Sequence, residues 1–134
     1  DKGDASFLTN HPQVELRPLS PGIHGLSNGG FDVPWPKTLQ VGEAITKWLD
    51  RGAAEVEPLL GALRDETPAP SPHRPELGPE PRFAPVFIRD AIYGTRCSTV
   101  ITVDREGRGS IVERSFDADG ARTGDVRIDF VWAV

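Results

Sequence analysis

The last strand-like segment of the chain constrains the fold most. Between residues 125 and 133 the sequence alternates, with Val126, Ile128, Phe130 and Trp132 separated by Arg127, Asp129 and Val131. A period of two is the pattern of a β-strand that buries one face. Two further β-rich segments, 97–104 and 110–116, precede it, and the turn-forming stretches 105–109 and 117–120 separate the three. The sequence therefore predicts an antiparallel meander with one face built to be covered.

Upstream of the meander, the hydrophobic period changes to that of a helix. Residues 37–51 place their apolar side chains near one face, and Gly52 follows where a helix commonly ends. A second helix is predicted over residues 55–65, with Pro58 in its first turn. Short strands are predicted at 5–10 and 14–17. Strands, two helices and a meander predict an α+β fold with an antiparallel sheet and two helices packed on one face.

The segment 66–82 carries six of the 13 prolines and no amphipathic period, so it predicts a Pro-rich mobile loop. His73 lies within it and is interpreted as a solvated loop residue. With 134 residues the chain is at most one ordinary domain. Because it begins with Asp1 and contains no Met, we expect residues 1–134 to be a single domain or the C-terminal portion of a longer one.

Charge and composition exclude several function classes. The net charge of −5 argues against nucleic acid or an anionic membrane as the main partner. No apolar run reaches the length of a membrane-spanning helix. The single cysteine, Cys97, excludes an internal disulfide and fits a reducing compartment, so a cytoplasmic location is expected.

Three places carry candidate site residues. Asn10 ends the first strand before a proline, where its amide could donate to an oxyanion or simply cap a turn. The glycine-rich stretch 22–32 contains His24 and Asn28, which could contact a ligand or form a turn-rich connection. Tyr93 and Arg96 lie at the start of a strand expected to be buried. There, Arg96 binds an anion or pairs internally with Asp90 or Asp104.

The histidine spacing does not predict a metal site, because His11, His24 and His73 have no i,i+4 or CxxC-like arrangement. Haem remains a candidate cofactor, since His24, His11 or Cys97 could in principle ligate its iron. Cys97 is not expected to be a nucleophile, because it lies within a sheet strand.

Four segments together resemble one known family. They are 21–28 (PGIHGLSN), 32–37 (DVPWPK), 93–100 (YGTRCSTV) and 112–116 (VERSF). This combination resembles the transport and Golgi organisation protein 2 family, also called the NRDE family, and corresponds to the C-terminal part of its members. The family's opening segment, with its near-terminal Cys and Asn-Arg-Asp-Glu motif, is absent.

The resemblance implies a fold and two site residues. The family is related to the N-terminal-nucleophile hydrolases, which are α-β-β-α sandwiches, so this chain is expected to form part of such a sandwich. The same superfamily includes the choloylglycine (bile-salt and penicillin V) hydrolases, in which an LTN-x-P segment supplies an oxyanion-hole Asn and an Arg at a later strand start assists the nucleophile. By resemblance these are Asn10 and Arg96, which are expected to converge on one pocket.

The resemblance also implies function. The leading expectation is a ligand-handling domain involved in haem or acyl-lipid trafficking and homeostasis, with haem or acyl-coenzyme A as its hydrophobic ligand. The alternative is an N-terminal-nucleophile amidohydrolase whose nucleophile lies in a missing N-terminal part, because Asp1 cannot act as one. A third reading is a small α+β interaction module. The expected partners are the missing N-terminal part, a second chain, or another copy in a homo-oligomer.

Overall fold

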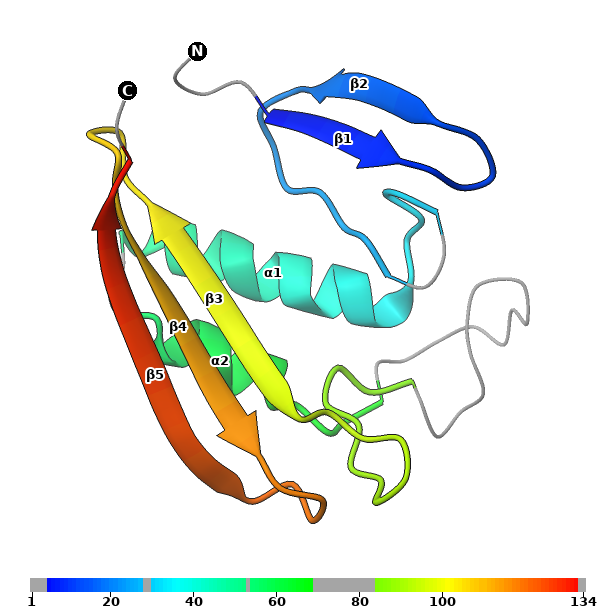
Figure 1. Ribbon diagram of the computed structural model, residues 1–134, viewed down its shortest axis with the longest axis vertical. Coiled ribbons are helices and arrows are strands. Elements are labelled where there is room, and N and C mark those ends of the chain that lie inside the picture. The colour runs from blue at the N-terminus through cyan, green and yellow to red at the C-terminus, as the bar shows by residue number, and fades with distance from the viewer. Residues whose placement is uncertain (1–4, 28–29, 53, 69–83, 133–134) are drawn as a thin grey trace.

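The computed structural model describes residues 5–27, 30–52, 54–68 and 84–132 (Figure 1). It contains two antiparallel sheets and two helices. Their order is β1 (Ala5–Thr9), β2 (Glu15–Leu19), α1 (Pro36–Asp50), α2 (Glu57–Leu63), β3 (Cys97–Val103), β4 (Arg108–Phe116) and β5 (Arg122–Val131). The predicted α+β architecture is confirmed. Most of the predicted Pro-rich loop 66–82, namely residues 69–82 with His73, lies outside the described residues.

The meander predicted from the C-terminal alternation forms the larger sheet, in the order β3-β4-β5. Its register brings Ile101, Ile111 and Ile128 side by side across the three strands. The turns on either side of β4 contain Gly107 and Gly120, whose φ angles of 80° and 75° favour glycine. Turn chemistry and alternation therefore fix this sheet locally.

Helices α1 and α2 lie on one face of the larger sheet (Figure 1). The centre of the core is formed by Leu59 and Leu60 of α2, packed against Val100 and Val112 of the sheet. Ile45 and Trp48 of α1 and Val56 and Leu63 of the α2 region are partly buried around this cluster. The helix layer thus covers the face that carries Val100 and Val112.

The ends of α1 follow from its sequence. Pro36 occupies the first turn, where its missing N–H leaves no helical hydrogen bond unmade. Gly52 follows the helix with φ 58°, and its N–H donates to the Leu49 carbonyl at 2.9 Å. Helix α2 is shorter than the predicted 55–65, because Val56 is already its N-cap and Pro58 lies in its first turn.

Neither described helix covers the other face of the sheet, which we call the open face. Its apolar side chains are Ile101, Val103, Ile111, Val126, Ile128 and Phe130, and Cys97, Thr99, Glu113 and Ser115 lie on it at the end near the start of β3. Ile101, Val126 and Ile128 are 62%, 60% and 55% exposed. The alternation in β5 thus correctly marks an apolar face, but the helices lie on the opposite face, where β5 presents Asp125, Arg127 and Asp129.

A buried guanidinium joins the helix layer to the sheet. Arg114 on β4 donates to Asp125 on β5 at 3.0 and 2.9 Å and to Glu57 at the start of α2 at 2.8 and 2.9 Å. Arg114 is only 8% exposed. Its hydrogen bonds lower the pKa of both carboxyl groups, so both remain ionised well below neutral pH. The start of α2 is thereby tied to two strands.

A second tie closes the end of the sheet where β4 meets β5. Phe87 is fully buried and contacts the edge of Phe116, and the Arg64 guanidinium lies 3.8 Å above the Phe87 ring centroid. Arg64 also donates to the Gly120 carbonyl at 2.9 Å. Arg89 and Arg64 both bond Glu66 and lower the pKa of its carboxyl to about 2. These contacts hold the segment leading into β3 against the sheet.

Replacing Arg114 tests the first tie. We expect Arg114→Ala to lower the free energy of unfolding by about 2 kcal/mol, because it leaves two carboxylates without their buried partner. The matched control is Arg127→Ala, on the same sheet face but with an exposed ion pair to Asp129. The control is expected to cost less than about 1 kcal/mol. Urea denaturation measures both, and equal losses would contradict the assignment.

Candidate functional site

The glycine-rich connection between β2 and α1 encloses a hollow of about 810 Å³ against the first turns of α1. We call it the loop hollow. Its apolar wall consists of Ile23, Leu26, Val33, Leu39, Val41, Ile45, Leu63 and Val86. Polar and charged residues also line it: His24, Ser27, Asp32, Lys37, Thr38, Glu43 and Thr46. A largely apolar hollow with a few polar groups is the usual form of a small-molecule site.

His24 holds the connection in shape. Its Nδ1 lies 2.8 Å from Asp32 Oδ2 and its Nε2 lies 2.9 Å from the Ser20 carbonyl oxygen. The other Asp32 oxygen accepts the Gly25 N–H at 2.8 Å. Asp32 reaches both partners from a backbone φ of 58°, which Asp tolerates better than most residues. We call this arrangement the His24–Asp32 latch.

The latch is most complete when His24 is protonated, because both ring nitrogens then donate to oxygen acceptors. The Ser20 carbonyl, and next the Asp32 carboxylate, raise the pKa of His24 above its usual 6.5. The same contact with His24, followed by the Gly25 N–H, lowers the pKa of Asp32. The charged pair is therefore favoured at pH values between these two pKa values.

Aromatic contacts attach the β1–β2 hairpin to this connection. Phe31 stacks on the His24 ring with centroids 5.4 Å apart and contacts Phe7 of β1 at 4.4 Å. The Arg17 guanidinium of β2 lies 5.3 Å from the Phe7 centroid and 4.9 Å from the Phe31 centroid. Cation–π attraction therefore adds to the apolar contact between hairpin and loop.

Lys37, in the first turn of α1, contributes a cation to the loop hollow. Partial burial lowers its pKa, and its Nζ lies 5.5 Å from the Trp35 ring centroid. Among the described residues, no carboxylate forms an ion pair with it. Next to it, Thr38 donates to the Trp35 carbonyl at 2.7 Å and packs against Gly25, where a Cβ would lie 3.2 Å from the Thr38 side chain. Gly25 thus permits a close approach between loop and helix.

Arg96 is satisfied by backbone oxygens. It donates to the Asp90 and Ala91 carbonyls at 3.2 and 3.1 Å, while the Asp90 carboxylate accepts the N–H groups of Ile92 and Tyr93. The strand that begins here was expected to be buried, but β3 is buried on one face only, and Arg96, one residue before it, is exposed. The expected pairing with Asp90 occurs through its carbonyl. Asp104 instead binds Arg108 at 2.9 Å.

Asn10 and His11 lie in the exposed turn of the β1–β2 hairpin, where Thr9 and His11 bond each other. That turn and the start of β3, next to Arg96, lie in separate parts of the molecule (Figure 1). The structure therefore does not bring Asn10 and Arg96 into one pocket. Asn28 lies outside the described residues.

His24 does not fit as a haem ligand in this arrangement, because both of its ring nitrogens are already hydrogen-bonded. Within the described part of the chain, no three His, Cys, Asp or Glu side chains are grouped to hold a metal ion. In the same residues, neither helix is long and apolar enough to cross a bilayer.

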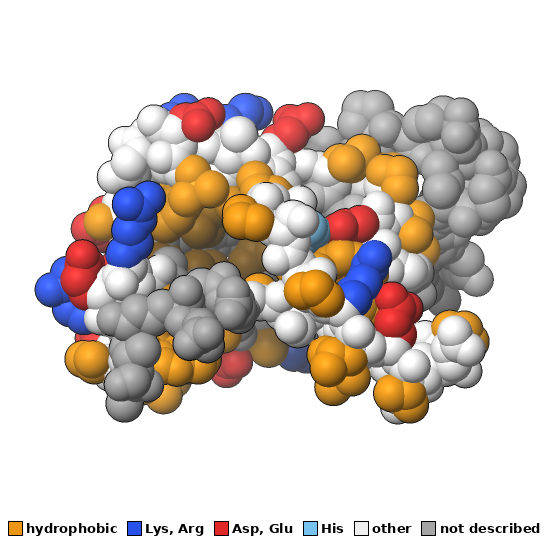
Figure 2. All heavy atoms as spheres, turned by 90° about the horizontal axis from the view of Figure 1, so that it is seen from above, with side chains coloured by type: hydrophobic (Ala, Val, Ile, Leu, Met, Phe, Trp, Pro, Cys, Tyr) orange, Lys and Arg blue, Asp and Glu red, His pale blue; other side chains and the backbone are white. Residues whose placement is uncertain are grey.

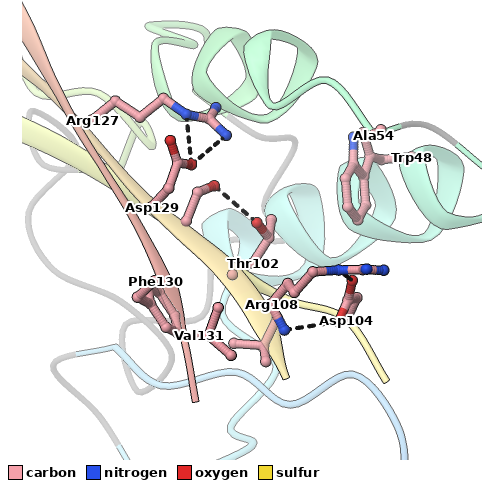
Figure 3. Close-up of a pocket in the computed structure, with 12 residues that line it drawn as sticks. Trp48, Ala54, Thr102, Asp104, Arg108, Arg127, Asp129, Phe130 and Val131 are labelled. Atoms are coloured by element: carbon pink, nitrogen blue, oxygen red, sulfur yellow. Dashed lines mark hydrogen bonds and ion pairs between the residues drawn. The ribbon is translucent and has the colours of Figure 1, made fainter. Parts of the chain in front are cut away.

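A second hollow, of about 680 Å³, lies beside Trp48 at the end of α1 (Figure 3). Its charged groups form ion pairs, Arg127 with Asp129 and Arg108 with Asp104. Two hydroxyl groups, those of Thr102 and Ser110, bond each other at 3.1 Å. Because these polar groups satisfy one another, the loop hollow is the stronger candidate site, since no described carboxylate pairs with its Lys37.

Comparison with known proteins gives the family. The family described as Transport and Golgi organisation 2 matches residues 1–118. The chain belongs to this family. The resemblance predicted from the four motif segments is therefore confirmed.

Three relatives from the Transport and Golgi organisation 2 family show the extent of the match. The Bos taurus "Transport and Golgi organization protein 2 homolog" is 35% identical over 128 residues, 86% of this chain and 46% of that protein. The Mus musculus homolog is 33% identical over 135 residues, which cover 90% of this chain and 49% of that protein. The Homo sapiens homolog is 31% identical over 127 residues, which cover 85% of this chain and 46% of that protein. The chain spans about half the length of these relatives.

The sequence indicated His24 as a candidate site residue, but not its partner Asp32 or the other lining residues Lys37 and Thr38. Asp32, Lys37 and Thr38 lie in or beside the DVPWPK segment, which marked the Transport and Golgi organisation 2 family without indicating a role. Arg17 was assigned only to a half-buried strand. A lysine at the start of a helix, preceded by Trp-Pro and a glycine-rich stretch, is the local signal that could have indicated an anion site.

The latch predicts a pH dependence. His24 is expected to titrate above 6.5 in the native protein, because its folded-state contacts favour the protonated ring. As pH rises through that pKa, the ring loses one donor, and either Asp32 or the Ser20 carbonyl loses its bond. Asp32→Asn is expected to lower the pKa of His24. A titration of the His24 ring by NMR measures this, and identical pKa values in both proteins would contradict the latch.

Proposed function

We propose that this domain of the Transport and Golgi organisation 2 family handles an acyl-lipid ligand, and that the ligand occupies the loop hollow. The ligand class is a long acyl chain with an anionic head group, such as an acyl-coenzyme A. This is the acyl-lipid half of the expectation from the family resemblance. The proposal places the domain in lipid trafficking and homeostasis, in a reducing compartment such as the cytoplasm.

The observation that carries the proposal is Lys37 in the loop hollow. Its ammonium group is partly desolvated, and the described residues offer it no carboxylate partner. A desolvated cation is costly without an anion, so an anionic head group that binds there recovers the lost interaction. The apolar wall, which includes Leu39, Val41 and Ile45, can bury an acyl chain at about 25 cal/mol per Å².

Two other expectations have less support. Haem as cargo would need an axial ligand, and His24 does not fit that role. The amidohydrolase alternative, with its nucleophile in an N-terminal part, would need Asn10 and Arg96 at one site, and they lie apart here (Figure 1). Asn10, Arg96 and Tyr93 stay predictions as candidate site residues.

The proposal extends to the fold of the whole protein. The open face exposes the apolar side chains of Ile101, Val126 and Ile128, and the relatives carry about half of their length outside the matched region. These two facts support a second β-layer packed on the open face, which would complete the α-β-β-α sandwich expected from the resemblance.

A matched pair of lysine variants tests the ligand proposal. Lys37→Ala is expected to weaken binding of palmitoyl-coenzyme A about tenfold, because a charge-assisted contact is lost. Lys47→Ala lies on the same helix, outside the loop hollow, and is expected to change binding less than about twofold. Isothermal titration calorimetry measures both. Failure of the wild type to bind, or equal losses in both variants, would refute the proposal.

Haemin is the competing ligand, and its binding to the same proteins is measured by absorption spectroscopy. The acyl-lipid proposal predicts that haemin gives no Soret band that depends on His24. A band that His24→Ala removes would show that the latch opens to bind iron, and would reassign the ligand to haem.

A further inference from the structure

A groove of about 420 Å³ runs along β3. Five consecutive residues of this strand line it, from Thr99 to Val103. Neighbouring side chains of a strand point to opposite faces, so one hollow that contacts all five runs along the edge of the sheet. We call it the edge groove. Within the described residues, β3 pairs with β4 on its other side and with no further strand.

The hydrogen-bond pattern shows which backbone groups face the edge groove. The Arg96 carbonyl accepts the Phe116 N–H, and the Asp104 N–H donates to the Arg108 carbonyl, both at 2.8 Å. Bonding alternates along an antiparallel pair, so the even-numbered residues of β3 bond to β4. The N–H and C=O groups of Thr99, Ile101 and Val103 therefore point toward the free edge. No described strand pairs with them.

Helix α1 forms a roof over this edge. Helix α2 lies against β3, whereas α1 packs on α2 and extends past the edge of the strand (Figure 1). Four apolar side chains of α1 line the edge groove, those of Val41, Ala44, Ile45 and Trp48. No residue of α1 is fully buried. Seen from above, hydrophobic side chains surround a recess in the surface (Figure 2).

The edge lacks the features that normally prevent strand pairing. Natural edge strands carry lysine, proline or a bulge, whereas β3 reads CSTVITV and pairs with β4 in an unbroken register. We propose that the free edge of β3 accepts one additional β-strand beneath α1. This strand comes from the region that the relatives carry outside the part matched by this chain. Its side chains facing α1 are apolar, because Ile45 and Trp48 form the roof.

The roof argues against a second copy as the occupant. Antiparallel pairing of two β3 edges about a two-fold axis places both α1 helices on the same side of the joined sheet. Each α1 already extends past its own edge, so both would occupy the same space. A single strand avoids this conflict. The relatives, which are about twice as long as the matched region, have the length to supply one.

Amide exchange tests the proposal at single-residue resolution. The 134-residue chain is co-expressed with the part of the Bos taurus homolog that lies outside the matched region, and the two are purified together. Strand addition is expected to slow exchange of the Thr99, Ile101 and Val103 amides at least tenfold. The Val100 and Thr102 amides, already bonded to β4, serve as internal controls and are expected to change little.

A helix variant tests the position of the strand. Ala44→Arg places a long side chain in the edge groove without altering β3, and is expected to weaken co-purification at least tenfold. Asp50→Arg adds the same side chain to the exposed end of α1 and is expected to leave it unchanged. Palmitoyl-coenzyme A binding is measured in parallel, so failure of the ligand proposal is distinguished from failure of this one.

Three outcomes would overturn the inference. They are absence of co-purification, co-purification without slower exchange at the three edge amides, and slower exchange at those amides that depends on the concentration of this chain alone. The last result would assign the edge to a second copy.

Discussion

The buried guanidinium of Arg114 is the contact on which the arrangement of layers depends. It joins β4 to Asp125 on the neighbouring strand and to Glu57 at the start of α2. Because α2 provides Leu59 and Leu60 to the core, the position of its first residue determines how those side chains meet the sheet. The apolar cluster stabilises the packing by burying side chains of α2 and the sheet, and the ion pairs of Arg114 with Asp125 and Glu57 fix the orientation of α2. Other alignments of α2 would leave a buried charge without a partner.

The sheet that Arg114 anchors has two unequal faces. The helix-covered face mixes apolar residues with satisfied ion pairs, whereas the open face joins an apolar part around Ile101, Ile111 and Ile128 to a polar end with Thr99 and Glu113. The loop hollow lies between the glycine-rich connection and α1. Helix α1 therefore contributes to two surfaces: of these, Lys37, Thr38 and Leu39 line only the loop hollow and Ala44 and Trp48 only the edge groove, whereas Val41 and Ile45 line both.

Local patterns predicted the elements well and their long-range relations poorly. The alternation over β5 and the helical period that ends at Gly52 depend only on residues close together in the sequence. The strand and the helix were therefore both predicted from the sequence. The face that the helices cover depends on Arg114 meeting Glu57, 57 residues away, which no local pattern encodes. For the site, His24 was identified from loop composition. The contact between His24 and Asp32 depends on the positive φ of Asp32, which the sequence did not indicate. The exposure of Arg96 depends on how the preceding loop folds back so that its Asp90 carbonyl meets the guanidinium.

The stack of Phe7, Arg17 and Phe31 has a mechanical consequence. Among the described strands, none pairs the β1–β2 hairpin with the larger sheet, yet Phe31 contacts the hairpin and also the imidazole of His24. Because Phe31 contacts both, we expect a shift of the hairpin to disturb the imidazole and its two acceptors, and with them the wall of the loop hollow that His24 lines.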